Sequence, residues 1–207
     1  MLIFIPLGMA IIIFTIYSKT RKSNATQKSI YQSFLKEERE SNFARKKDPE
    51  PEDYLTVDIH RLPIREYPDD PTYTRVAARQ KNILEIARLP MICDVRGMTN
   101  RELKLKYGTA NLDTIITYEE NYNRFIHNLL EWATALTGLG NNIDAAVVLE
   151  AAIDHRCDRS QAYTMLADIT TDRDKLGALQ KKAQAALLGS ALGRTLAHID
   201  QRLDAIK

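Results

Sequence analysis

The residues best suited to chemistry in this chain stand together in the run DHRCD, which contains a histidine, an arginine and a cysteine. His155 and Arg156 directly precede Cys157, and cationic neighbours of this kind can lower the pKa of a thiol and make it nucleophilic. The alternative is a polar turn between two helices. We favour the turn, because such clusters occur more often in turns than in catalytic sites.

No other group of residues has the spacing of a catalytic, metal or cofactor site. None of the four histidines belongs to an HExxH motif or another ligand spacing. The GLG run at 138–140 lacks the following lysine and the preceding strand of a phosphate loop, and Asp113, Glu119 and Glu120 fit the solvated start of a helix. We therefore expect no enzyme, no metal, no cofactor and no small-molecule substrate.

Composition narrows the class of protein further. The chain has 207 residues with 44% hydrophobic content, which is enough for one core of ordinary size. The net charge of +2 argues against a nucleic-acid binder, which would show a basic face and stacking aromatic residues. Only two cysteines occur, Cys93 and Cys157, so we expect neither a disulfide framework nor a zinc site. We expect the protein to reside in a reducing compartment.

The chain begins with MLIFIPLGMAIIIFTIY, a run of 17 residues without a charged side chain. At about 1.5 Å per residue a helix of this run spans roughly 26 Å, slightly less than a hydrocarbon core of about 30 Å. Three cations, Lys19, Arg21 and Lys22, follow the run, and their long side chains can reach the interface. We expect an uncleaved transmembrane anchor at 1–18, because a cleaved signal peptide would carry its basic residues before the apolar run.

The position of these cations also predicts an orientation. Positive charge after the span places the rest of the chain in the cytoplasm and the short N-terminus outside. The sequence therefore predicts a single-pass protein of the cell membrane whose C-terminal domain is cytoplasmic.

Residues 19–47 form a basic segment in which nine Lys or Arg stand against three Glu. The apolar residues Ile30, Tyr31, Phe34 and Leu35 recur at helical spacing. One interpretation is a juxtamembrane amphipathic helix lying along an anionic leaflet, and the other is a solvated helical stalk. The sequence favours neither.

Residues 48–69 turn acidic, and Pro49 and Pro51 break any helix. Leu55, Val57 and Ile59 alternate with polar residues, which is typical of an extended segment. A lone strand has no partner in a helical chain, so we expect a strap that lies over the helical domain, with a free linker as the alternative. Whether residues 54–63 fill a groove there is left open.

Helical signals fill residues 70–207. Asp70 and Pro71 have the types of an N-cap and first helical residue, for a helix reaching Leu89. Thr99 and Glu102 have the spacing of a capping box before a helix that Gly108 ends. We expect a long helix to begin at Asn111, and two more helices in KLGALQKKAQAALL and ALGRTLAHIDQRLDAI.

The long helix and its successors show a periodic pattern. Leu129, Trp132, Ala133 and Leu136 stand at i, i+3, i+4 and i+7, and a shift of 34 residues places the first three on Tyr163, Leu166 and Ala167. A 34-residue period of large and small residues resembles tetratricopeptide (TPR) repeats. About one and a half units match, although Cys157 stands where proline closes a typical unit. The positions that resemble those packing residues are Leu129, Trp132, Ala133, Gly140, Ala145, Leu149, Ala152, Tyr163, Leu166 and Ala167.

The chain combines the apolar run with the charged segment FLKEERESNFARKK, the strap DYLTVDIHRLP and the helix entry RELKLKYGTANL. This layout resembles a group of uncharacterised bacterial single-pass membrane proteins that carry a TPR-like domain. The expected fold is thus all-α, with an N-terminal transmembrane helix followed by an antiparallel helical-repeat domain. The resemblance implies a concave partner-binding face made of His127, Leu130, Thr134, Thr137, Gln161, Thr164, Asp168 and Thr171.

These residues are mostly small and neutral, and the Lys and Asn pattern that clamps a C-terminal carboxylate in some TPR domains is missing. An equally good interpretation is that the strap or the C-terminal helices of the chain itself cover this face. We expect a membrane-tethered adaptor for an unknown protein partner, and the alternative is a self-associating structural protein, a homo-oligomer, without an external ligand groove.

Overall fold

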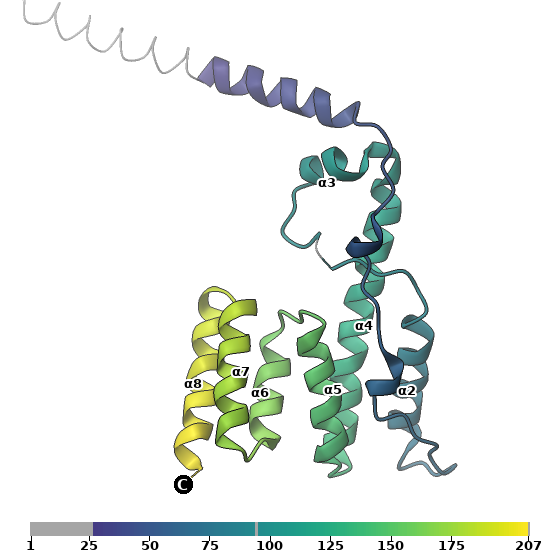
Figure 1. Cartoon of the computed structure of the whole chain (residues 1–207), viewed down its shortest axis with the longest axis vertical. Helices are drawn as coiled ribbons and strands as arrows, with labels where there is room; N and C mark the ends of the chain where they lie inside the picture. Colours follow the sequence, from purple (N-terminus) through teal and green to yellow (C-terminus); the bar gives the residue numbers. More distant parts are fainter. Residues whose placement is uncertain (1–26, 94, 207) are drawn as a thin grey trace, which may run out of the picture. The chain divides into compact units, whose positions relative to one another are not determined.

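Helices and short turns make up the regular structure of residues 27–93 and 95–206, which a computed structural model describes (Figure 1). The expected all-α class is confirmed for these residues, where the only strand-like pairing is an isolated antiparallel bridge between Tyr54 and Ile92. No helix in this part of the chain is long and apolar enough to cross a membrane. The expected anchor at 1–18 lies outside the described residues.

Contacts between residues divide the chain into two units. Unit 1 contains the chain up to Asp48 together with Gly97–Leu112, and unit 2 contains Pro49–Arg96 and Asp113–Lys207. This grouping differs from the expected order of segments. The strap belongs to the helical body, whereas the stretch around the capping box belongs with the basic N-terminal segment.

Unit 1 is built from a helix at residues 27–42, α3 (Asn100–Tyr107) and the short 3-10 helix η3 (Thr109–Asn111). The capping box before α3 is confirmed: Thr99 N–H donates to Glu102 at 2.6 Å, and Glu102 N–H donates to Thr99 Oγ1 at 3.3 Å. These N–H and hydroxyl donors of Thr99 lower the pKa of the Glu102 carboxyl.

The end of α3 holds residues 45–48 in place. Lys47 N–H donates to Tyr107 O at 2.9 Å, and the Asn111 amide donates to Lys47 O and Asp48 Oδ1 at 2.8 and 3.0 Å. Gly108 has a φ of 80°, and a Cβ on it would lie 2.7 Å from Lys46 Cα. Glycine is therefore required here both by the backbone conformation and by this close approach.

The strap runs through two 3-10 turns, η1 (Pro51–Asp53) and η2 (Ile59–Arg61), instead of staying extended throughout. Leu55 N–H donates to Met91 O at 2.8 Å, and Leu62 is 7% exposed. Leu55 and Val57 are partly buried against the core. These contacts dock the strap on unit 2, whereas a free linker would make no such contacts.

The helix that follows the strap, α2 (Thr74–Ile86), begins later than expected. Asp70 is not its N-cap, because the Asp70 carboxylate accepts from Thr72 N–H at 2.7 Å and closes a turn before the helix. The helix also ends before Leu89. Local hydrogen bonding of an aspartate to the second residue after it competes with capping, and here the turn wins.

The remaining helices of unit 2 follow in chain order, side by side, in Figure 1. Of these, α6 packs against α5, α7 and α8, and α7 packs against α8. Trp132 on α4 is fully buried in the core that they share. Their bounds are α4 (Leu112–Gly138), α5 (Asn142–Asp154), α6 (Ser160–Ile169), α7 (Arg173–Ala186) and α8 (Gly189–Ala205).

The residues that resemble repeat-packing positions lie in this core, with one exception. Each of them is at most 6% exposed except Gly140, which forms the α4–α5 turn with a φ of 72°. Small residues on adjoining helices allow the close approach that such burial requires. The pattern therefore marks helix packing, and its assignment to the TPR family remains an interpretation.

Candidate functional site

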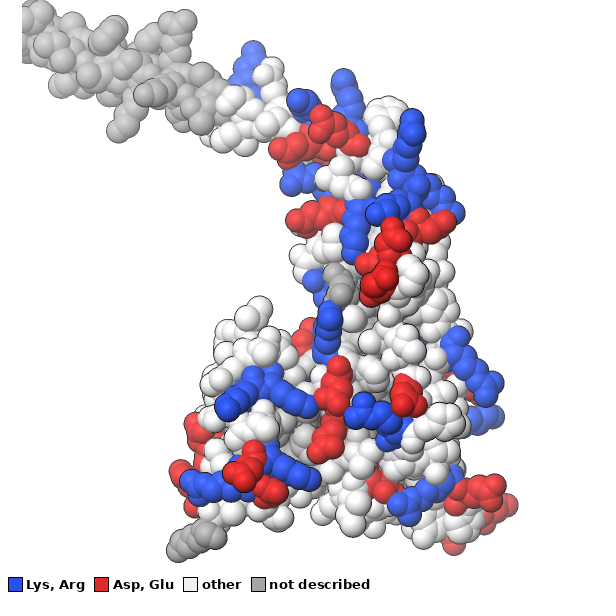
Figure 2. All heavy atoms as spheres, in the orientation of Figure 1, with Lys and Arg blue, Asp and Glu red and all other residues white. Residues whose placement is uncertain are grey.

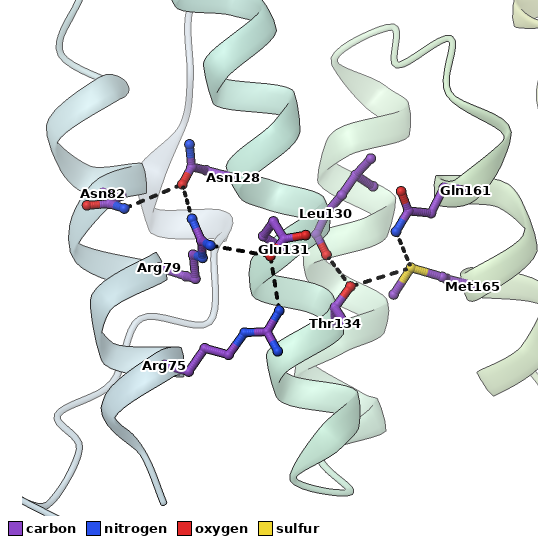
Figure 3. Close-up of polar contacts among 9 residues, drawn as sticks. All are labelled: Arg75, Arg79, Asn82, Asn128, Leu130, Glu131, Thr134, Gln161 and Met165. Carbon is purple, nitrogen blue, oxygen red and sulfur yellow. Dashed lines mark hydrogen bonds and ion pairs between the residues drawn. The ribbon is translucent and has the colours of Figure 1, made fainter. Parts of the chain in front are cut away.

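The helix α4 carries half of the expected partner-binding face, and α2 covers one flank of α4 (Figure 3). Arg75 and Arg79 of α2 place Nη2 atoms 3.0 and 3.3 Å from Glu131 Oε2. Arg79 also donates to Asn128 Oδ1 at 3.2 Å. Through these contacts α4 pairs with residues of α2 that lie 49 to 56 positions earlier in the chain. The sequence did not indicate this pairing.

On α4, the four expected face residues differ in accessibility. His127 is exposed, and Thr134 and Thr137 are half-buried, with hydroxyls that donate to Leu130 O and Ala133 O of their own helix. Leu130 is only 2% exposed and belongs to the core, so its side chain cannot line an open face. Leu130 is therefore a core residue and not, as expected from the sequence, part of an open partner-binding face. Thr134 Oγ1 instead approaches Met165 Sδ of α6 at 3.9 Å (Figure 3).

The other four face residues lie on α6 and just after it. Gln161 approaches Met165 Sδ at 3.6 Å, and the Thr164 hydroxyl donates to Gln161 O at 3.2 Å. Thr171 is exposed in the α6–α7 connection, outside both helices. Asp168 is exposed too, but the chain's own last helix engages it.

That engagement comes from His198 and Arg202 on α8. His198 Nε2 lies 2.8 Å from Asp168 Oδ1, and Arg202 donates to Ala167 O and Asp168 O at 3.3 and 3.0 Å. A C-terminal helix thus occupies the α6 end of the expected face. Neither residue was foreseen, because a separation of 30 residues or more leaves no local pattern.

The strap does not lie on this face but on α5. Arg65 Nη2 is 2.7 Å from Asp144 Oδ1 near the start of α5, and Arg61 Nη2 is 3.9 Å from Asp154 Oδ2 at its end. The Asp144 side chain is only 4% exposed.

The main concave feature of the described residues is a groove between α5 and α7, with α6 at its base. Three adjoining clefts share lining residues along it, and the largest of them has a volume of about 530 Å³. A fourth cleft, between the strap and α5, adjoins them at Glu150 and Asp154. Lys182 of α7 bridges to Asp154 of α5 at 2.7 Å. Basic and acidic side chains alternate over α5 and α7 in the view of Figure 2. We call this feature the α5–α7 groove; it is lined by Ile143, Val147, Glu150, Asp154, Thr170, Lys175, Leu179 and Lys182.

Glu150 stands where three of these clefts meet. Its side chain is exposed, and it forms no ion pair with any residue that the structure describes. The adjoining cleft beside the strap adds Asp58 and Asp154 against a single cation, Arg61. The cleft beside the strap therefore has more acidic than basic lining residues, next to apolar ones such as Val147, whereas Lys175 and Lys182 line the clefts toward α7.

The largest cleft borders the DHRCD turn, which Arg96 ties down. Arg96 donates to Cys93 O at 3.3 Å and to Arg156 O at 2.7 Å, and pairs with Asp158 at 2.9 Å. Its guanidinium also lies 4.9 Å from the centre of the Tyr122 ring. All three nitrogens of the guanidinium are used structurally, so Arg96 acts as a clasp and not as an open anion site.

The thiol of the DHRCD turn lacks the exposure and the lowered pKa of a nucleophilic thiol. Cys157 is fully buried, and burial raises the pKa of its thiol. Burial likewise raises the pKa of Tyr163 to about 12, and the Tyr163 hydroxyl donates to Cys157 O at 2.9 Å. A neutral, enclosed thiol supports the interpretation of DHRCD as a polar turn.

Neither metal chemistry nor a known relative adds a function. The described residues contain no group of three or more His, Cys, Asp or Glu side chains placed to hold a metal ion. Comparison of the chain with models of protein families, with curated proteins and with solved structures found no significant match.

Proposed function

We propose that this chain is a membrane-tethered adaptor, in which a TPR-like helical domain at the cytoplasmic face of the membrane holds a protein partner. The N-terminal apolar run supplies the tether and raises the local concentration of the domain at the inner leaflet. The packing of successive antiparallel helices in unit 2 supports a scaffold of stacked hairpins. The observation that carries the proposal is the α5–α7 groove.

The groove supports a partner segment with a basic side chain beside an apolar one. Glu150 offers a carboxylate without a cation from the described chain, and Ile143, at 80% exposure, adds apolar surface at the same groove. A charge at the edge of an interface mainly sets specificity and association rate. Glu150 is therefore the residue whose charge should decide which partner binds.

The proposed site overlaps the expected one only at the end of α6, where Thr171 lines a cleft of the groove. The expected face uses α4 and α6, where Leu130 is buried and Asp168 is engaged by α8. The groove uses α5 and α7 instead. Variants in each surface can therefore separate the two possibilities.

The test is an affinity capture with full-length tagged protein from detergent-solubilised cells, comparing wild type with Glu150→Lys. Placing a lysine opposite the partner's cation should weaken binding by about tenfold or more, because like charges repel at close range. Glu85→Lys is the matched control, since Glu85 is an exposed glutamate on α2 away from the groove. Thr134→Arg samples the α4–α6 face without changing a buried residue.

A protein that wild type, Glu85→Lys and Thr134→Arg retain and Glu150→Lys loses would support the groove. Loss with Thr134→Arg alone would return the site to the α4–α6 face. Capture of nothing except the chain itself would reject the adaptor and favour the self-associating alternative. Ile143 and Leu188, 80% and 85% exposed, are among the apolar side chains available for such a contact.

A further inference from the structure

We propose that the helix at residues 27–42 lies on the surface of an anionic lipid bilayer, with its apolar stripe in the interface. This inference rests on the proposed membrane tether and adds a second, peripheral contact to it. It concerns unit 1 alone.

The stripe is exposed to a degree that is unusual for large apolar side chains. Ile30 and Tyr31 are each 61% exposed, Phe34 is 51% and Leu35 is 46%. Positions i, i+1, i+4 and i+5 fall on one side of a helix, so the four form a single surface. A clustered apolar surface of this kind marks a site of interaction with a protein or a membrane, whereas single exposed residues need no explanation.

The acidic side chains of unit 1 are engaged within it. Glu37 pairs with Arg101 and Glu38 with Lys104 at 4.0 Å, so α3 holds the C-terminal half of the helix. Glu40 pairs with Lys36 at 3.9 Å, and Asp48 with Lys46 at 3.5 Å. Glu102 is bound in the capping box.

Charge is segregated between the two units. In residues 1–48 and 97–112, Lys and Arg outnumber Asp and Glu by 12 to 5, whereas in the rest of the chain acids outnumber bases by 22 to 17. Figure 2 shows basic side chains over α3 and the helix before it, with fewer acidic side chains among them. An anionic leaflet attracts the first unit and repels the second, so the overall charge of +2 conceals a strongly polarised chain.

A lipid surface explains these features together. An amphipathic helix with apolar residues on one side and cations around it binds in the plane of an anionic interface. The 17-residue apolar run that precedes it in the sequence would deliver the helix to that interface. A second copy of this basic unit would instead meet like charge.

The experiment places one environment-sensitive fluorophore on the full chain through Phe34→Cys, on the stripe, or through Gln32→Cys, on another side of the helix. Both native cysteines are buried, at 7% and 0% exposure, which favours selective labelling of the introduced thiol. The protein is reconstituted into vesicles of phosphatidylcholine with or without phosphatidylserine. Flotation on a density gradient first measures the tether, and emission, iodide quenching and quenching by spin-labelled lipid then measure contact of each position with the bilayer.

In phosphatidylserine vesicles, we expect the Phe34→Cys label to shift to the blue, to be several-fold less quenched by iodide than the Gln32→Cys label, and to be quenched by the lipid. The contact should weaken in high salt and in pure phosphatidylcholine. Protein that floats while both labels are equally open to iodide would overturn the surface helix and leave the tether standing. Shielding from iodide without quenching by lipid would assign the stripe to a protein contact instead. Protein that does not float would reject both proposals.

Discussion

Replacing Arg65 with alanine should destabilise unit 2 by more than its exposure suggests. Arg65 is the strap residue whose Nη2 lies 2.7 Å from Asp144 Oδ1, and the guanidinium side chain is 58% exposed whereas the carboxylate is 4% exposed. Truncation removes only a partly solvated cation. It leaves the buried charge of Asp144 with the Asn141 amide, at 2.7 Å, as its remaining side-chain donor.

The magnitude follows from this asymmetry. Removal of one partner from a fully buried ion pair costs about 3–5 kcal/mol, whereas an exposed pair is worth about 0–1 kcal/mol. Asp144 keeps the Asn141 hydrogen bond and lies in the first turn of α5, where the helix dipole favours negative charge. We therefore expect Arg65→Ala to lower the free energy of unfolding by about 1–2 kcal/mol.

The assay is urea unfolding of the full chain in detergent, followed by the fluorescence of Trp132. This is the single tryptophan of the sequence and is fully buried in unit 2, so its emission reports that unit. Arg61→Ala is the matched control on the same strap, because Arg61 is 74% exposed and 3.9 Å from Asp154. Its cost should stay below about 0.5 kcal/mol.

A second background isolates the charge. In Asp144→Asn the buried group is neutral, so the further loss of Arg65 should cost less than about 0.5 kcal/mol. An unpaired buried charge would be excluded as the cause if Arg65→Ala cost no more than Arg61→Ala, or if its cost were the same with aspartate and with asparagine at position 144.

Two further predictions concern backbone and pH. Gly108→Ala should release residues 45–48 from α3 and so speed the hydrogen exchange of the Lys47 amide, because the new Cβ would collide with the backbone of Arg45 and Lys46. The control is Gly97→Ala, which should leave that amide protected, since Gly97 has a φ of 82° and no atom near its Cβ position. Equal exchange in both variants would contradict the close approach at Gly108. Burial lowers the pKa of His155 from 6.5, so its contribution to stability is present above pH 6.5 and is lost as the pH falls through the lower pKa of the folded state. His155→Gln should therefore show a smaller loss of urea resistance than wild type between about pH 7.5 and about pH 5, and identical pH slopes would show that His155 does not contribute.

Local signals in the sequence predicted the helices well where one physical rule acted alone. The capping box at Thr99 and Glu102 and the terminating Gly108 appear as expected, since side-chain caps and positive φ are decided by neighbouring residues. At Asp70 two local rules competed. The same side chain can cap a helix or close a turn, and the sequence alone does not rank the two.

The candidate site was less predictable because it depends on contacts between distant residues. Arg65 and Asp144 are 79 positions apart, and Arg96 and Arg156 are 60 apart, so no periodicity connects them. Glu150 belongs to none of the motifs or periodic patterns of the sequence. Its place at the meeting point of three clefts depends on the strap on one side of α5 and on α6 and α7 on the other.

Leu130 shows why a repeat pattern can misplace a binding face at the end of an array. In a long array the first helix of each unit is half open, but the first unit of a short array exposes an extra flank that must be covered. Here α2 covers that flank of α4 through Arg75 and Arg79, and α8 contacts α6 through His198 and Arg202. These contacts engage both sides of the α4–α6 surface, although His127, Asp168 and Thr171 stay exposed on it. The groove between α5 and α7, where Glu150 forms no ion pair with a described residue, is the surface that we propose for a partner.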